Sequence, residues 1–132
     1  MTQQTYTKMR EKAEEYIQRG YSVVLDATHI NILDRKKALD IAKKYNHKTL
    51  IVDLQITKTE ALRRIESRKF DHLSVSDATS EIYLEQVQQL IPISEKEGPT
   101  MVIKTDDSPQ KICLLYTSHA ADQGLGLDLG GR

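Results

Sequence analysis

Apolar residues along this chain repeat with two periods, one typical of helices and one typical of buried strands. Residues 4–19 carry apolar side chains at spacings of three and four, which predicts an amphipathic helix with the buried stripe Tyr6, Met9, Ala13, Tyr16 and Ile17. Gly20 follows and is placed to end that helix in a left-handed conformation. In residues 22–25, three of the four side chains are apolar without polar alternation, which predicts a strand buried on both faces.

Two further helices are predicted before residue 70. Asp34 is the expected N-cap of a helix over 33–46, whose inward stripe is Ala38, Ile41, Ala42 and Tyr45. Thr57 and Glu60 have the spacing of a capping box and are expected to open a helix over about 58–69. The apolar side of that helix is Ala61, Leu62 and Ile65.

A loop and a fourth helix are predicted next. Residues 70–77 are polar and irregular, which indicates a loop. Ser76 or Asp77 then caps a helix that runs to about Leu90 and is ended by Pro92. Its apolar stripe is Tyr83, Val87, Leu90 and Ile91.

Strands and helices alternate along the chain, which predicts an α/β fold. Besides residues 22–26, strands are predicted at 49–54 and 101–104. We therefore expect about three parallel strands, with helices on both faces and right-handed crossovers.

The character of the chain changes near Ile112. Four of the six glycines fall in the last nine residues, and neither a helical nor a strand period continues there. Residues 111–132 are therefore expected to form a flexible tail foreign to the domain, similar to read-through sequence from an adaptor. Residues 1–110 form the predicted domain.

Composition excludes several classes of protein. The chain has 132 residues, enough for one small domain, and its 19 basic and 19 acidic side chains leave no strong signal for nucleic acid or membrane. The single Cys113 excludes an internal disulfide framework and fits a reducing, cytoplasmic location. No apolar run approaches the ~20 residues that span a membrane.

Polar side chains gather after the first predicted strand. In an open α/β sheet, ligands bind at the carboxyl ends of the strands, and here that end carries Asp26, Thr28 and His29. Arg35 follows near the start of the next helix, either as solvated surface or as an anion ligand near the strand tip. Asp26 has the alternative of capping a turn, and His29 that of an exposed loop residue. No second histidine has metal-ligand spacing with His29, so no protein metal site is predicted.

Two arginines lie on one face near the end of the predicted helix 58–69. Arg64 and Arg68 are four residues apart, so they project the same way and repel each other weakly. An anion beside them would compensate that repulsion. The alternative is a structural role, because positive charge near a helix C-terminus favours the helix dipole.

These segments together resemble the P-loop kinases, in particular the polynucleotide-kinase-like and zeta-toxin-like group. The resemblance runs over residues 5–110 and rests on Asp26-Ala27-Thr28-His29, Asp34-Arg35 and the Arg64/Arg68 helix, with weaker likenesses at 76–79, Tyr83 and 97–99. It implies a partial three-layer P-loop NTPase sandwich. It further implies that Asp26 lies near Mg²⁺ and the phosphates, and that Thr28 and His29 lie on the acceptor side. Arg64 and Arg68 would be lid arginines, and residues 70–76 would form the mobile lid.

One part of the family's pattern is missing from the sequence. Such kinases hold phosphates with a Gly-x-x-x-x-Gly-Lys-Ser/Thr loop, and no Gly-Lys-Ser or Gly-Lys-Thr occurs in the 132 residues. The chain therefore resembles the C-terminal part of a kinase domain. ATP and Mg²⁺ are expected cofactors of the full-length parent, and neither is expected to bind this chain tightly.

Three functions remain open from the sequence. The first is a fragment of an ATP-dependent kinase that phosphorylates a hydroxyl and has little activity alone. The second is a non-catalytic anion- or nucleotide-binding module, and the third is a structural or truncated product. The acceptor is equally open, between a polynucleotide 5′-hydroxyl, a sugar, an amino sugar nucleotide and a small metabolite.

Overall fold

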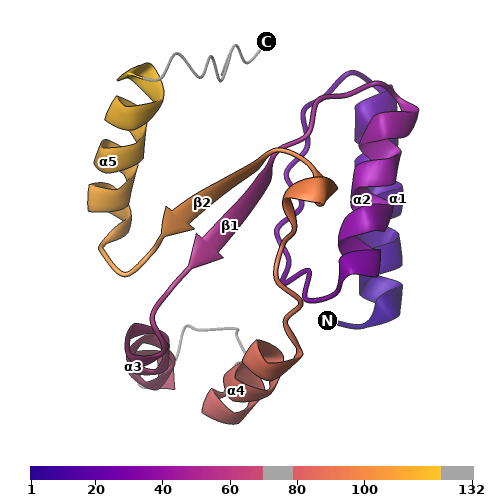
Figure 1. The fold of residues 1–132 in the computed structure, drawn as a ribbon. Helices are drawn as coiled ribbons and strands as arrows, with labels where there is room; N and C mark the ends of the chain where they lie inside the picture. Colours follow the sequence, from indigo (N-terminus) through magenta and orange to yellow (C-terminus); the bar gives the residue numbers. More distant parts are fainter. Residues whose placement is uncertain (70–78, 123–132) are drawn as a thin grey trace. The chain divides into compact units, whose positions relative to one another are not determined.

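A computed structural model describes residues 1–69 and 79–122 (Figure 1). The chain forms two compact units, Met1–Val52 with Val75–Met101 and Asp53–Ser74 with Val102–Arg132. The predicted domain boundary at residue 110 stays a prediction. In chain order the elements are α1 (Gln3–Gln18), α2 (Ile32–Lys44), β1 (Ile51–Gln55), α3 (Lys58–Lys69), α4 (Ser80–Gln89), the 3₁₀ turn η1 (Glu95–Glu97), β2 (Thr100–Lys104) and α5 (Pro109–Asp122).

The α/β prediction is confirmed, with a smaller sheet than expected. β1 and β2 form a two-stranded parallel sheet (Figure 1). The amide of Ile51 donates to the carbonyl of Pro99 at 2.9 Å, and the amide of Thr105 donates to the carbonyl of Gln55 at 2.7 Å. These bonds extend the pairing at both ends of the sheet.

The predicted strand at 22–26 is not part of this sheet. Residues 22–26 carry no strand assignment, and no backbone–backbone hydrogen bond to residues 22–28 occurs in the described ranges. Val24 is 89% exposed, so the expected burial on both faces is also wrong. The physical reason is that strand structure requires a neighbouring strand to supply ladder hydrogen bonds, and apolar sequence alone does not provide one.

Helix α1 begins and ends as its sequence requires. The side chain of Thr2 caps the first turn by accepting from the amide of Thr5 at 3.3 Å. At the other end Gly20 adopts φ 84°, which confirms its predicted left-handed conformation. The amides of Gly20 and Tyr21 donate to the carbonyls of Ile17 and Tyr16, the pattern of a Schellman cap.

Helix α2 starts earlier than predicted and packs beside α1 (Figure 1). Asn31, not Asp34, is the N-cap, and its side-chain oxygen accepts from the amide of Asp34 at 2.8 Å. Asp34 lies within the first turn, where a carboxylate favours the helix dipole, and its carboxylate accepts from the Asn31 amide group at 2.6 Å. Arg10 of α1 lies 3.5 Å from the same carboxylate.

Helix α3 has the predicted range, but its capping residue Thr57 is held by a different residue from the one that the sequence predicted. Thr57 caps the helix by accepting from the amide of Glu60 at 3.4 Å. Glu60 does not reach back to Thr57. Instead, Asp106 accepts from the amide and the hydroxyl of Thr57, at 2.9 and 2.6 Å. A residue 49 positions away thereby holds the start of the helix.

The last two helices correct the sequence analysis. Helix α4 is capped by Thr79 rather than by Ser76 or Asp77, which lie outside the described residues. Residues 109–122 form α5, although the sequence predicted a flexible tail from residue 111. Ser108 opens α5 by accepting from the amide of Lys111 at 3.3 Å, and Pro109 follows it, a position where its missing amide costs nothing.

Each unit has a small core. Among the described residues, the buried apolar side chains are Tyr6, Ala13 and Ala42 in the first unit and Ala61 and Ile65 in the second. Alanines contribute little apolar area, so polar contacts hold much of the first unit together.

Candidate functional site

The predicted strand tip is organised around the buried phenol of Tyr6. Tyr6 lies on α1 and is 5% exposed. Its hydroxyl accepts from the backbone amide of His29 at 3.0 Å and lies 3.2 Å from the hydroxyl of Thr28. Its ring contacts the imidazole edge-on, with centroids 5.5 Å apart. The structure thus brings Thr28 and His29 together through a residue that the sequence analysis assigned only to the apolar stripe.

His29 has a strained backbone. Its φ of 43° lies in the left-handed region, which costs a non-glycine residue about 1–3 kcal/mol. The hydrogen bond from its amide to Tyr6 stabilises that conformation. The imidazole Nδ1 lies 3.3 Å from the carbonyl of Ala27, so the ring is held on two sides.

Asp26 and Thr28 are exposed beside this turn. Within the described ranges, the Asp26 carboxylate makes no hydrogen bond or ion pair, so the capping role left open by the sequence is not seen. Its predicted role near Mg²⁺ stays a prediction. The predicted role of Thr28 on the acceptor side likewise stays a prediction.

Arg35 is neither solvated surface nor free to bind an anion. It is 5% exposed and forms a two-pronged ion pair with Glu97, at 2.6 and 3.1 Å. Its other donors point at backbone carbonyls. These belong to His29, Ile30, Ile91 and Pro92, at 2.9, 3.3, 3.0 and 3.4 Å. All five guanidinium N–H groups are directed at protein oxygens, so both sequence interpretations of Arg35 are corrected to a structural role beneath the strand tip.

Glu97 completes this contact and was not singled out as a site residue. It lies in η1, where its carboxylate also accepts from the amide of Ser94 at 2.9 Å. The hydrogen bond from Arg35 holds the pKa of Glu97 below its ordinary value, against the opposing effect of burial. A charged pair therefore ties α2 to η1 inside the first unit. Two sequence signals for Glu97 existed, the capping-box spacing with Ser94 and the weak likeness of residues 97–99 to P-loop kinases.

Arg64 and Arg68 line a hollow of about 410 Å³ in the second unit. Arg64 donates to Glu60 at 2.7 Å and to the carbonyls of Thr105 and Asp107 at 2.6 and 3.1 Å. Arg68 is exposed and makes no ion pair with any residue of the described ranges. The two arginines therefore differ in what they can offer a ligand. The predicted lid, residues 70–76, lies outside the described residues.

Glu60 is expected to titrate far below its ordinary pH. Hydrogen bonds from Arg63 and then Arg64 lower its pKa from 4.5 to about 2. Because the folded-state pKa is depressed, these pairs stabilise the fold above pH 4.5 and lose that contribution as the pH falls toward 2. We expect an NMR titration of the Glu60 carboxyl to show this low midpoint. Arg63→Ala should raise it, whereas Lys8→Ala on α1 should leave it unchanged.

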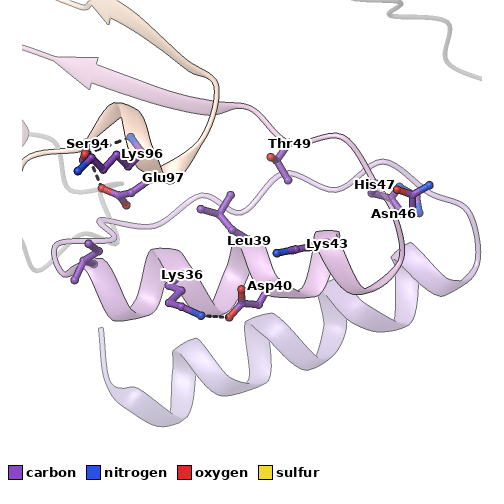
Figure 2. A pocket seen from close by; sticks show the side chains of 11 residues that line it. Lys36, Leu39, Asp40, Lys43, Asn46, His47, Thr49, Ser94, Lys96 and Glu97 are labelled. Atoms are coloured by element: carbon purple, nitrogen blue, oxygen red, sulfur yellow. Dashed lines mark hydrogen bonds and ion pairs between the residues drawn. The ribbon is translucent and has the colours of Figure 1, made fainter.

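A second hollow lies along α2 in the first unit (Figure 2). It is a groove of about 620 Å³, with Leu39 and Lys43 from α2 on one side and Thr49 and Lys96 from the following segments on the other. Lys36 in the same groove is neutralised by Asp40 at 2.7 Å. Lys43 and Lys96 have no such partner among the described residues, so they give the groove a positive character.

Comparison with known proteins assigns the family. A family model described as an AAA domain matches residues 1–93. The chain belongs to the AAA-domain family. The matched range includes the strand tip, Arg35, Arg64 and Arg68, and the AAA domain is a P-loop, nucleotide-binding fold of kinase or ATPase type. The resemblance to P-loop kinases is thereby confirmed at this coarser level. A search of curated proteins found no match.

Two features that could hold a metal ion or phosphates are absent from the described residues. No group of three or more histidine, cysteine or acidic side chains that could hold a metal ion occurs in residues 1–69 and 79–122. The sequence also lacks the Gly-Lys-Ser/Thr loop that would hold phosphates.

Within residues 1–69 and 79–122, no helix has the length and hydropathy needed to cross a membrane.

Proposed function

We propose that this AAA domain is the C-terminal part of an ATP-dependent kinase of the polynucleotide-kinase-like and zeta-toxin-like group. Its parent would transfer the γ-phosphate of ATP to a hydroxyl, and this chain alone would have little activity. The proposed acceptor side is the strand tip with Asp26, Thr28 and His29, and the proposed lid arginine is Arg68, in a cytoplasmic enzyme. The family match supports the nucleotide-dependent class of reaction.

The observation that carries the proposal is the unpaired segment 22–26. It contains Val23, Val24 and Leu25, yet it pairs with neither described strand, and Val24 is 89% exposed. Covering such an apolar side chain with a neighbouring strand would remove its surface from water. In the parent, we propose that the strand leading into the phosphate loop pairs with this segment. The strand tip and the phosphates would then lie at the same end of one sheet.

Calorimetry with ATP tests the fragment assignment. We expect the purified chain to show no micromolar binding of ATP with or without Mg²⁺, because the backbone amides and lysine of a phosphate loop are missing. A recombinant version extended upstream to include a Gly-x-x-x-x-Gly-Lys-Ser/Thr segment should bind Mg²⁺–ATP. Micromolar, Mg²⁺-dependent binding by the chain as it stands would contradict the proposal.

The groove along α2 favours a second candidate function, a non-catalytic module that binds anions. Lys43 and Lys96 would hold the anionic group, and Leu39 would contact an apolar part of the ligand (Figure 2). The same calorimetry distinguishes the two functions. A binding module would take up ATP weakly and without Mg²⁺, and Lys43→Gln with Lys96→Gln would abolish that signal. Lys8→Gln, on α1 outside the groove, is the matched control.

A further inference from the structure

The phenol of Tyr6 fixes the direction of a hydrogen-bond chain at the strand tip. Its oxygen already accepts from the amide of His29 at 3.0 Å. The phenol hydrogen needs an acceptor of its own, because Tyr6 is 5% exposed and buried donors are almost always satisfied. Within the described ranges the acceptor in reach is the Thr28 oxygen at 3.2 Å. Tyr6 therefore donates to Thr28.

This direction leaves the hydroxyl hydrogen of Thr28 free. A threonine hydroxyl carries one hydrogen and two lone pairs, and Tyr6 occupies a lone pair. Thr28 is exposed, so its hydrogen can be directed at a ligand. Thr28 thus acts as a donor on the open side of the strand tip.

The imidazole of His29 offers a hydrogen-bond acceptor, whereas Thr28 offers a donor. Its Nδ1 lies 3.3 Å from the carbonyl oxygen of Ala27, and a carbonyl oxygen can only accept. In the neutral ring, Nδ1 therefore carries the hydrogen and Nε2 carries the lone pair. Nε2 has no partner in the described part of the chain, so it is available as an acceptor.

We propose that Tyr6 is a positioning residue that prepares the strand tip to bind a hydroxyl group. Thr28 would donate to the oxygen of the ligand hydroxyl, and His29 Nε2 would accept its hydrogen. A hydroxyl satisfies both partners, whereas a carboxylate cannot donate and an ammonium cannot accept. The identification of this ligand as the phosphoryl acceptor rests on the proposed function.

The tautomer of His29 tests the proposal in the chain itself. Long-range ¹H–¹⁵N spectra of protein with ¹⁵N-labelled histidine, recorded above the pH at which the ring is protonated, report which nitrogen carries hydrogen. We expect His29 to be the Nδ1–H tautomer, opposite to the Nε2–H form that free imidazole side chains prefer. His47 is exposed and makes no side-chain hydrogen bond within the described ranges, so it should show the Nε2–H form.

Variants test whether Tyr6 sets the tautomer of His29 or whether the turn around His29 sets it alone. Tyr6→Phe removes the hydroxyl that holds the His29 amide, and we expect most of the Nδ1–H signal of His29 to be lost. Tyr16→Phe makes the same chemical change at a 43% exposed position of α1 and should leave the tautomer unchanged. Should Tyr6→Phe fail to fold, Thr28→Val removes the acceptor of the phenol hydrogen and should lower the same signal.

Two results would overturn the inference. One is a wild-type His29 in the Nε2–H form, and the other is a folded Tyr6→Phe or Thr28→Val variant with an unchanged tautomer. Neither depends on ATP or on kinase activity. A failure of the kinase proposal in calorimetry would therefore leave the hydroxyl-binding arrangement standing, and the reverse also holds.

Discussion

Arg35→Ala should strongly destabilise the first unit. The substitution leaves the carboxylate of Glu97 buried without its cation, and it also removes the donors that hold four backbone carbonyls. Breaking a buried ion pair from one side costs about 3–5 kcal/mol. Small domains are stable by only about 5–15 kcal/mol in total, so the loss is a large share. Urea unfolding followed by circular dichroism measures the change in the free energy of unfolding.

Matched variants identify the cause of that loss. Arg63→Ala removes an ion pair whose arginine is 65% exposed, so it should change the free energy of unfolding far less than Arg35→Ala does. Arg35→Lys keeps the charge but not the two-pronged geometry, so it should restore only part of the stability. An Arg35→Ala variant as stable as Arg63→Ala would refute the structural role of Arg35.

In the proposed full-length kinase, Arg68→Ala should lower kcat by as much as ~10³-fold with little change in melting temperature. Arg68 is exposed and has no ion pair in the described ranges, so its removal costs the fold little. In phosphoryl transfer, an arginine that stabilises the charge of the transferring group contributes an effect of that size. Kinetics of the purified enzyme with thermal unfolding of each variant provide the measurement.

Arg64→Ala is the informative comparison. Arg64 binds Glu60 and the carbonyls of Thr105 and Asp107, so its loss should lower the melting temperature more than the loss of Arg68. Arg68→Lys should recover part of kcat, because a point charge replaces a planar fork only partly. Near-normal kcat in Arg68→Ala would exclude the lid role and leave Arg64 as the next candidate.

Local interactions explain why much of the secondary structure could be predicted from the sequence. The range of α1, the left-handed Gly20 and the cap of α3 at Thr57 depend on neighbours a few residues apart. Helix periodicity and capping act over such distances. α5 is the exception. The sequence contains the residues that begin this helix, Ser108 and Pro109. The glycine-rich C-terminal end nevertheless led to the prediction of a flexible tail.

The sequence alone also indicated the residues of the strand tip and a resemblance to P-loop kinases, which the AAA-domain match supports at a coarser level. Asp26, Thr28 and His29 are adjacent in the chain, so their grouping needs no tertiary contact, and the order of the motifs suffices for the resemblance. The tertiary structure decided which other side chains hold these site residues in place. Tyr6 is 23 positions from His29, and Glu97 is 62 positions from Arg35.

Hydrogen bonds and burial over such separations depend on how the helices pack, and no local pattern encodes that packing. The same limit applies to the strand at 22–26. Its sequence favours a strand, but pairing requires a neighbour, and the described chain provides none for it. The local sequence thus determined which secondary structure each segment can form. Contacts with distant residues decided whether Arg35 lies on the surface or in the interior and whether Val24 is covered or exposed.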